Sequence, residues 1–277
     1  MRPYNCCPLL AQQVAHSCIS PEPPLPSSKP VRTQRINLCS SDYMKLQRHI
    51  DEESRAILID RLVSVHSQLK LLAETLHLTV NIIDRFLEKE PKATCRQLDL
   101  IGVTAMFIAS KYEEQVAPDS DWFGHYGHCS REQILAMEGE MLSKLNYQLA
   151  APNALVFLKR FSVANAVLAT PRTKAKLLAQ YLIELALQDY TMLQHLPSTT
   201  AAAAAYLALK AIGGREMRTA TVELLQQAGS TEDEIMPCVK KLHAIHGNAE
   251  ANELQAVRKK FARKLFGSVT RMRPATL

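Results

Sequence analysis

Glycine is scarce in this sequence, and the short motifs of common catalytic sites are missing. Only nine of the 277 residues are glycine, so few flexible loops are available to cradle a phosphate group. The patterns G-x-x-x-x-G-K, G-x-G-x-x-G, G-x-S-x-G and H-E-x-x-H are all absent. The adjacent carboxylates Glu113 and Glu114 lie at an expected helix end, where such groups are usually solvated. We therefore expect a protein that is not an enzyme and needs no cofactor.

Paired cysteines and long apolar runs are also missing. The seven cysteines are an odd number and include no C-x-x-C pair, which argues for reduced thiols inside a cell. No apolar run approaches the ~20 residues that cross a bilayer. The start of the chain, MRPYNCCPLLAQQVAHSC, lacks the apolar core and cleavage site of a signal peptide. We expect an intracellular protein without membrane association.

Positive charge is in only modest excess. The net charge is +6, and part of it comes from a C-terminal run that contains Arg258, Lys259, Lys260, Arg263 and Lys264. Apolar residues recur among these cations at intervals of four, which favours a packed helix with a solvated basic face over a nucleic-acid or import-receptor site. We therefore do not expect a nucleic-acid partner.

Proline is concentrated near the N-terminus. Seven prolines fall within the first 30 residues, and prolines at that density block helices and strand ladders. We expect a short disordered tail over residues 1–42. Within it, Arg35 and Leu38 form the minimal R-x-x-L pattern of a degradation signal, a pattern that is also common by chance.

Apolar residues at helical spacing dominate the rest of the chain, and 47% of all residues are hydrophobic. This periodicity predicts an all-α protein, and the length suggests two domains. Capping residues, acidic first turns, prolines and glycines set the expected helix ends. The first group of expected helices covers 51–69, 70–88, 94–114, 130 onward and 152–163. After a linker at 164–170, the second group covers 171 onward, 201–212, 219–228, 231–246 and 249–264.

The helix at 94–114 is expected to form the centre of the first domain. It is apolar on nearly every side for three turns, and its small residues let neighbouring backbones approach closely. The stretch AAAAAYLALKAI at 201–212 has the same character, and aligning the two places Lys210 against Lys111. The alignment suggests a faint all-helical duplication. Chance similarity between two core helices is the alternative.

The segment 117–130 contains the only tryptophan together with a proline and two glycines, which predicts a loop. Several of its side chains are of the types that bind zinc, but no second ligand cluster with finger-like spacing lies nearby. We interpret it as a polar loop without a metal, and we treat His243 and His246 in the same way. The side chains concerned are Asp119, Asp121, His125, His128 and Cys129.

Several long motifs occur in one order along the chain. They are SRAILIDRLVSVHSQLKLLAETLHLTVNIIDRFL, QLDLIGVTAMFIASKYEE and REQILAMEGEMLSKLNYQLAAPN. This first half resembles the first cyclin box of a mitotic, B-type cyclin. The later stretches LAQYLIELALQDYTMLQHLPSTTAAAAAYLALKAIG and EIMPCVKKLHAIHGNAEANELQAVRKKF are similar to the C-terminal cyclin fold. The resemblance covers residues 43–267.

The resemblance implies two tandem five-helix cyclin-fold domains, at 43–151 and 152–277, after the tail at 1–42. It implies a non-catalytic regulatory subunit that binds and activates a cyclin-dependent serine/threonine kinase and so controls progression through G2 and mitosis. The expected partner is the catalytic subunit of that kinase. Such a protein is expected in the nucleus and the cytoplasm.

The resemblance also implies a kinase-binding surface. The lysine and glutamate that contact the kinase in the family match Lys111 in SKYEE and Glu138 in AMEGEML. An ammonium and a carboxylate suit this role, because they can hold exposed backbone groups in one register while apolar neighbours supply affinity. The predicted kinase-binding residues are Ile108, Lys111, Tyr112, Glu113, Glu138, Leu142, Tyr147 and Leu149.

Arg55 and Asp84 match family positions that form an internal ion pair. The family's substrate-docking patch usually reads Met-Arg-Ala-Ile-Leu-x-Asp-Trp, and in this chain a serine and an arginine replace its methionine and tryptophan. Loss of the aromatic anchor predicts weak or altered docking of R-x-L substrates or inhibitors. The residues at the patch are Ser54, Ile57, Leu58 and Arg61.

Two other functions fit parts of the sequence. A cyclin-fold transcription factor would be expected to carry paired C-x-x-C motifs and stronger basic faces, and neither is present. A helical scaffold that binds a kinase without activating it is the second alternative, because no clear counterpart of the family's N-terminal helix precedes Tyr43.

Overall fold

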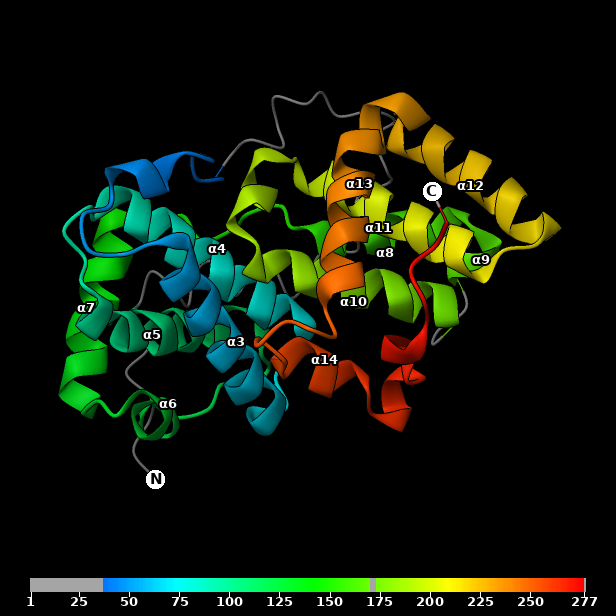
Figure 1. Ribbon diagram of the computed structural model, residues 1–277. Helices are drawn as coiled ribbons and strands as arrows, with labels where there is room; N and C mark the ends of the chain where they lie inside the picture. Colours follow the sequence, from blue (N-terminus) through cyan, green and yellow to red (C-terminus); the bar gives the residue numbers. More distant parts are fainter. Residues whose placement is uncertain (1–36, 170–172, 277) are drawn as a thin grey trace.

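The structure of the protein is a computed structural model that describes residues 37–169 and 173–276. Every regular element within those ranges is a helix, and the helices form two groups that lie side by side (Figure 1). None of these helices is long and apolar enough to cross a membrane. The prediction of an all-α fold is confirmed.

The first group begins with a short 3-10 helix and continues with five α-helices. Capping residues fix several of their starts, since the Ser130 hydroxyl accepts from Gln133 N at 3.3 Å and the Gln133 side chain accepts from Ser130 N at 2.8 Å. The elements are η1 (Tyr43–Leu46), α3 (Glu52–Leu69), α4 (Ala73–Lys89), α5 (Cys95–Glu113), α6 (Ser120–Gly127) and α7 (Arg131–Lys144).

The second group has five longer helices and several short ones. Thr231 caps one of the longer helices by accepting from Glu234 N at 3.3 Å, as its sequence pattern predicts. The elements are α8 (Ala154–Ala164), α9 (Ala166–Ala169), α10 (Lys174–Gln188), η2 (Tyr190–Gln194), α11 (Pro197–Ile212), α12 (Arg215–Ala228), α13 (Glu232–Asn248), α14 (Ala256–Phe261), η3 (Lys264–Phe266) and η4 (Val269–Arg271).

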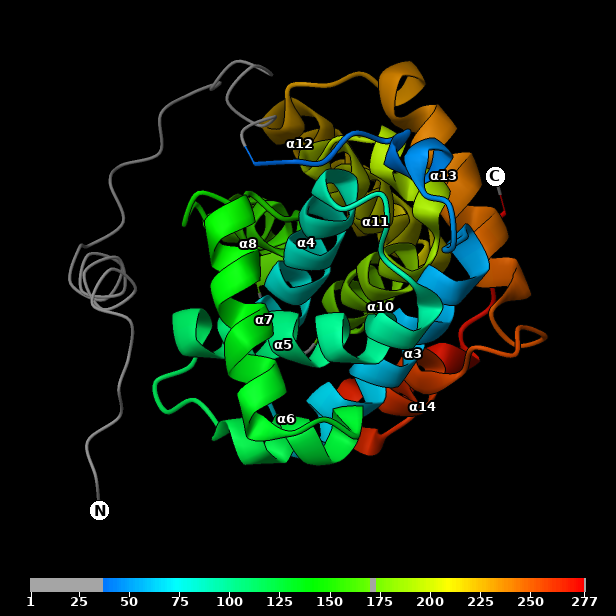
Figure 2. The ribbon, with the colours of Figure 1, turned by 90° about the vertical axis from the view of Figure 1, so that its left-hand side faces the viewer.

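Helix α5 is the centre of the first group, as its apolar circumference predicts. It packs against α3, α4, α6 and α7, which surround it in Figure 2. A Cβ atom on Gly102 would lie 2.8 Å from Leu58 Cδ1, so the glycine permits the close crossing with α3. Helix α11 has the same place in the second group, where it contacts α8, α10, α12 and α13.

The prediction of a loop at 117–130 is wrong, because α6 lies within that segment. Asp119 caps this helix, and Phe123 within it is fully buried. The two glycines that suggested a loop instead allow close packing: a Cβ atom would lie 2.6 Å from Cys129 O at Gly124, and 2.7 Å from Val103 Cγ2 at Gly127. Within 37–169 and 173–276, no group of three or more His, Cys, Asp or Glu side chains is placed to hold a metal ion.

Two other local predictions also need correction. The expected linker at 164–170 contains the short helix α9. The basic helix expected at 249–264 is shorter, since α14 spans Ala256–Phe261, and its Lys260 is not solvated. The Lys260 side chain is 7% exposed and donates to both oxygens of Glu184, at 2.8 and 2.7 Å. The carboxylate partner lies 76 residues away in α10, so helical spacing gives no sign of it.

The last residues of the expected tail belong to the packed structure. Asn37 Nδ2 donates to Ala150 O at 2.7 Å, and Ser40 N donates to Glu88 Oε1 at 2.9 Å. Ordered packing therefore extends at least as far as Asn37 instead of beginning at 43. Leu38 of the R-x-x-L pattern is part of this segment, whereas Arg35 and the rest of residues 1–36 lie outside the described residues.

Polar contacts join the two helix groups. Asp60 Oδ1 in α3 accepts from Gln188 Nε2 and from Ala256 N, each at 2.8 Å. The second of these bonds holds the start of α14, which lies against α3 and α10 (Figure 1). Within the second group, the buried pair of Lys260 and Glu184 holds α14 against α10. The two bonds to Asp60 then fix α3 of the first group against this unit.

Lowering the pH from 7 to 5.5 is expected to reduce the free energy of unfolding by about 3 to 4 kcal/mol. Burial first, and the charge of Lys260 second, lower the pKa values of His66 and His77 to about 3. Burial first, and the charge of His243 second, lower the pKa of His246 to about 4. All three rings stay neutral in the fold, whereas the unfolded chain takes up protons below pH about 6.5. This stability is present above that pH and is lost as the pH falls toward 3. Urea titrations across the range measure the effect.

The variant His77→Phe tests whether the pH dependence of stability comes from the buried histidines. It should lose about a third of this pH dependence, because the buried imidazoles of His66 and His246 remain. A urea midpoint that does not move between pH 7 and 5.5 in the unmodified chain would contradict the prediction.

Candidate functional site

Lys111 and Glu138 lie together on the surface of the first group, at the end of α5 and in α7. Their side chains form an ion pair and are 14% and 11% exposed. Lys111 Nζ also lies 4.2 Å from the centroid of the Phe107 ring. An ammonium has three donors and a carboxylate can accept several hydrogen bonds. Because the ion pair uses only part of this hydrogen-bonding capacity, both groups can still bind a partner. The surrounding helices hold them in place.

The apolar residues predicted for this surface divide into two kinds. Ile108, Leu142 and Leu149 are 0%, 3% and 1% exposed, so in this conformation they form the core beneath the surface and offer no contact area. Tyr147 is 36% exposed. It lies in the turn after α7 and has a left-handed backbone with φ of 57°. Tyr147 is thus the exposed aromatic group of the site.

The end of α5 also anchors the start of the neighbouring helix. Glu114, interpreted from sequence as solvated, accepts from Leu72 N at 2.7 Å and from Thr75 Oγ1 at 2.6 Å. It thereby caps α4, whose own N-cap residue Leu72 has no polar side chain. Tyr112 and Glu113 are half-buried beside it. Burial, with a smaller contribution from Glu74, raises the pKa of Glu113.

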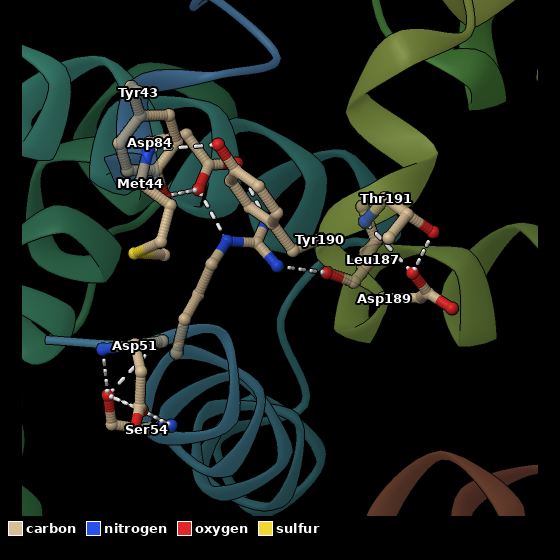
Figure 3. Close-up of polar contacts among 10 residues, drawn as sticks. Tyr43, Met44, Asp51, Ser54, Asp84, Leu187, Asp189, Tyr190 and Thr191 are labelled. Atoms are coloured by element: carbon tan, nitrogen blue, oxygen red, sulfur yellow. Dashed lines mark hydrogen bonds and ion pairs between the residues drawn. The ribbon is translucent and has the colours of Figure 1, made fainter. Parts of the chain in front are cut away.

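The ion pair predicted between Arg55 and Asp84 is present and buried, and Figure 3 shows its surroundings. Arg55 Nε and Nη2 donate to the two Asp84 oxygens at 2.6 and 2.8 Å, and its third bond, from Nη1 to Leu187 O at 3.1 Å, reaches α10. Tyr43 donates its hydroxyl to Asp84 Oδ1 at 2.8 Å. The Tyr43 and Tyr190 rings meet edge to face at 5.3 Å. This network joins η1, α3, α4 and the second group.

The residues at the predicted docking patch form a mostly polar surface. Ser54 uses its hydroxyl in the cap of α3, where it donates to Asp51. Arg61 forms an ion pair with Asp99 at 2.5 Å, with both side chains about half exposed. Leu58 is buried, so Ile57, at 46% exposure, is the apolar group left at the surface. A single aliphatic side chain beside an ion pair makes a poor apolar cleft.

Two family models match consecutive parts of the chain. "Cyclin, N-terminal domain" matches residues 29–150, and "Cyclin, C-terminal domain" matches residues 152–275. The chain belongs to the cyclin family. The two matches follow the two helix groups of the structure, which confirms the tandem arrangement of cyclin folds.

Relatives of this cyclin include B-type cyclins of animals and plants. The chain is 41% identical over 237 residues to a G2/mitotic-specific cyclin-B of Hydra viridissima, covering 85% of this chain and 58% of the relative. It is 43% identical to the corresponding protein of Hydra vulgaris, covering 82% and 61%, and 38% identical to Cyclin-B2-4 of Arabidopsis thaliana, covering 84% and 53%. The chain thus spans between half and two thirds of the length of these relatives.

Solved structures share the fold of this cyclin at low sequence identity. A viral cyclin from herpesvirus saimiri aligns with a TM-score of 0.65 at 19% identity, over 73% of this chain and 88% of that one. A chain of the CAK complex from Chaetomium thermophilum, bound to ATP-gamma-S, aligns with a TM-score of 0.54 at 14% identity, over 90% and 85%. At these identities the likeness concerns the fold alone.

Proposed function

We propose that this cyclin is the regulatory subunit of a cyclin-dependent serine/threonine kinase and acts in G2 and mitosis. The observation that carries the proposal is the placement of Lys111 and Glu138 side by side on two packed helices, with Tyr147 exposed on the turn after α7. The names of the B-type relatives support the stage of the cell cycle. The chain itself is non-catalytic in this proposal, and it acts in the nucleus and cytoplasm.

The proposed activation is a shift between kinase conformations. A surface that fits only the active arrangement of the kinase stabilises that arrangement by the difference between its two binding free energies. Such a surface must itself be rigid. Helix α5 meets this need, because it is enclosed by four other helices and most of its residues are buried.

A histone-kinase assay tests the proposal. The tagged chain is used to purify its partner from extract of its own cells, and the phosphate transferred to histone is compared with that of the kinase alone. We expect activity only in the presence of the cyclin, and mass spectrometry of the co-purified protein identifies the kinase. Stoichiometric binding of a kinase without activity would favour the non-activating scaffold. Binding to promoter DNA without any kinase would favour the transcription factor.

Restoring the family residues at the docking patch is expected to strengthen binding of an R-x-L peptide about 10-fold. The variant combines Ser54→Met with Arg61→Trp, which removes the ion pair with Asp99 and adds two apolar side chains beside Ile57. A buried aromatic anchor contributes on the order of 1 to 2 kcal/mol or more to such contacts. Fluorescence anisotropy with a labelled peptide measures the affinity.

A matched control for this variant is Arg131→Trp. Arg131 is also about half exposed and pairs with Asp119, but it lies at the start of α7. It should leave peptide affinity unchanged. Equal affinities of the unmodified chain and the double variant for the R-x-L peptide would count against the assignment of the patch.

A further inference from the structure

A small cavity lies between the two helix groups, beside the Arg55 and Asp84 pair. Its volume is about 130 Å³, and its walls come from α4 and residues 38–39 on one side and from α8, α10, η2 and α11 on the other. Val80, Ile183 and Ala186 contribute apolar surface to it. An engineered apolar cavity of about 150 Å³ in another protein binds benzene. The space between the two groups is therefore large enough for a small ring.

His77 contributes an unused polar group to the cavity. Its side chain is 4% exposed and lines the cavity, and the described part of the chain offers its ring no hydrogen-bond partner. Since burial lowers the pKa of this histidine to about 3, the ring is neutral and carries one donor and one acceptor. Buried polar groups are nearly always paired in folded proteins. The ring thus offers a bonding position to whatever enters the cavity.

The described lining of the cavity leaves no charge free for an ionic ligand. Arg55 and Asp84 border it, but they bond to each other, and their remaining contacts go to Leu187 O and the Tyr43 hydroxyl. Burial lowers the pKa of His195, which keeps that ring neutral as well. An ion would therefore lose its hydration without gaining a counter-charge.

We propose that this cavity binds a small uncharged molecule, about the size of a substituted six-membered ring, whose one polar group pairs with the His77 ring. The apolar walls would contact the body of the molecule. Because those walls come from both cyclin folds, the bound molecule stabilises their present arrangement. The proposal does not depend on the kinase-activating function.

Phenol is a suitable probe, because it combines a six-membered ring with one hydroxyl group. Histidine ring resonances of the full chain are followed by NMR as phenol is added. We expect the His77 signals to shift and saturate. The signals of His66 serve as an internal control, because that ring is also buried but bonds through Nε2 to Leu72 O at 2.8 Å, outside the cavity lining. Benzene and benzoate should each bind at least 10-fold more weakly than phenol.

Two variants test separately how the cavity volume and the His77 ring contribute to phenol binding. Ala186→Leu fills the cavity and should abolish phenol binding, whereas Gln180→Leu, at a partly exposed position of α10 outside the lining, should retain it. His77→Phe should remove the preference for phenol over benzene. If that variant does not fold, the titration of the unmodified chain decides. His77 signals that stay unchanged at high phenol concentration, as they would if water alone filled the cavity, overturn the proposal. Equal binding of benzene does so too.

Discussion

An Asp84→Ala variant is expected to lose about 3 to 5 kcal/mol of unfolding free energy. The substitution leaves Arg55 as a cation at 1% exposure, and of its three hydrogen bonds only the one to Leu187 O remains. It also removes the acceptor of the Tyr43 hydroxyl. The cost is large because the guanidinium has already lost its water and now loses its counter-charge as well. Urea titration followed by circular dichroism measures the change.

Asp99→Ala is the matched control for this prediction. It breaks the ion pair between Asp99 and Arg61, whose side chains are 40% and 51% exposed, respectively. Exposed ion pairs contribute at most about 1 kcal/mol to the free energy of unfolding. Replacing both buried partners, by Arg55→Met with Asp84→Leu, should be less damaging than Asp84→Ala because no unpaired charge remains. A loss below about 1 kcal/mol in Asp84→Ala would mean that water reaches Arg55, contrary to its burial here.

A double variant, Lys111→Ala with Glu138→Ala, is expected to abolish co-purification of the kinase. Removing charged groups from such an interface costs about 2 to 5 kcal/mol of binding free energy, or roughly 30-fold to several thousand-fold in affinity. The helical melting transition should change little, because the two groups pair with each other and removing both leaves no charge unpaired. Quantitative pull-down from cell extract, with thermal melting followed by circular dichroism, measures both quantities.

Lys210→Ala is the control for the binding result. Lys210 lies in α11, at the position that the internal alignment places against Lys111, and its Nζ lies 2.9 Å from the Tyr206 hydroxyl oxygen. The kinase-binding surface is assigned to the first group alone, so this variant should bind as the unmodified chain does. Wild-type recovery of the kinase by the Lys111 and Glu138 double variant would show that the interface is misplaced.

Local sequence patterns predicted most helices, because the signals involved act over a few residues. The caps at Thr94, Ser130 and Thr231 bond to groups three positions away, within the reach of a helical turn. The apolar circumference of residues 98–109 likewise predicted the central helix. Helix α6 was not predicted, because its two glycines were interpreted as turn residues. In the structure they instead allow close contacts with Cys129 and Val103, which local sequence rules do not describe.

The partners of the buried polar groups could not be predicted from spacing. Glu184 lies 76 residues from Lys260, and the acceptor Glu114 lies 42 residues from Leu72. Such pairs depend on how whole helices pack, so each residue alone looks like a surface charge. Likeness to the family located Arg55 with Asp84 and drew attention to Lys111 with Glu138. That the latter two pair with each other emerged only from the structure.

The bonds that join the two cyclin folds also set an order for completing the structure during synthesis. Arg55 finds its third acceptor, Leu187 O, 132 residues later in the chain. Asp60 accepts from Ala256 N, 196 residues later. While the ribosome is still making the second half, water must take the place of these partners, and the face that meets α14 is uncovered. We expect a nascent first domain to remain only partly ordered until α14 emerges.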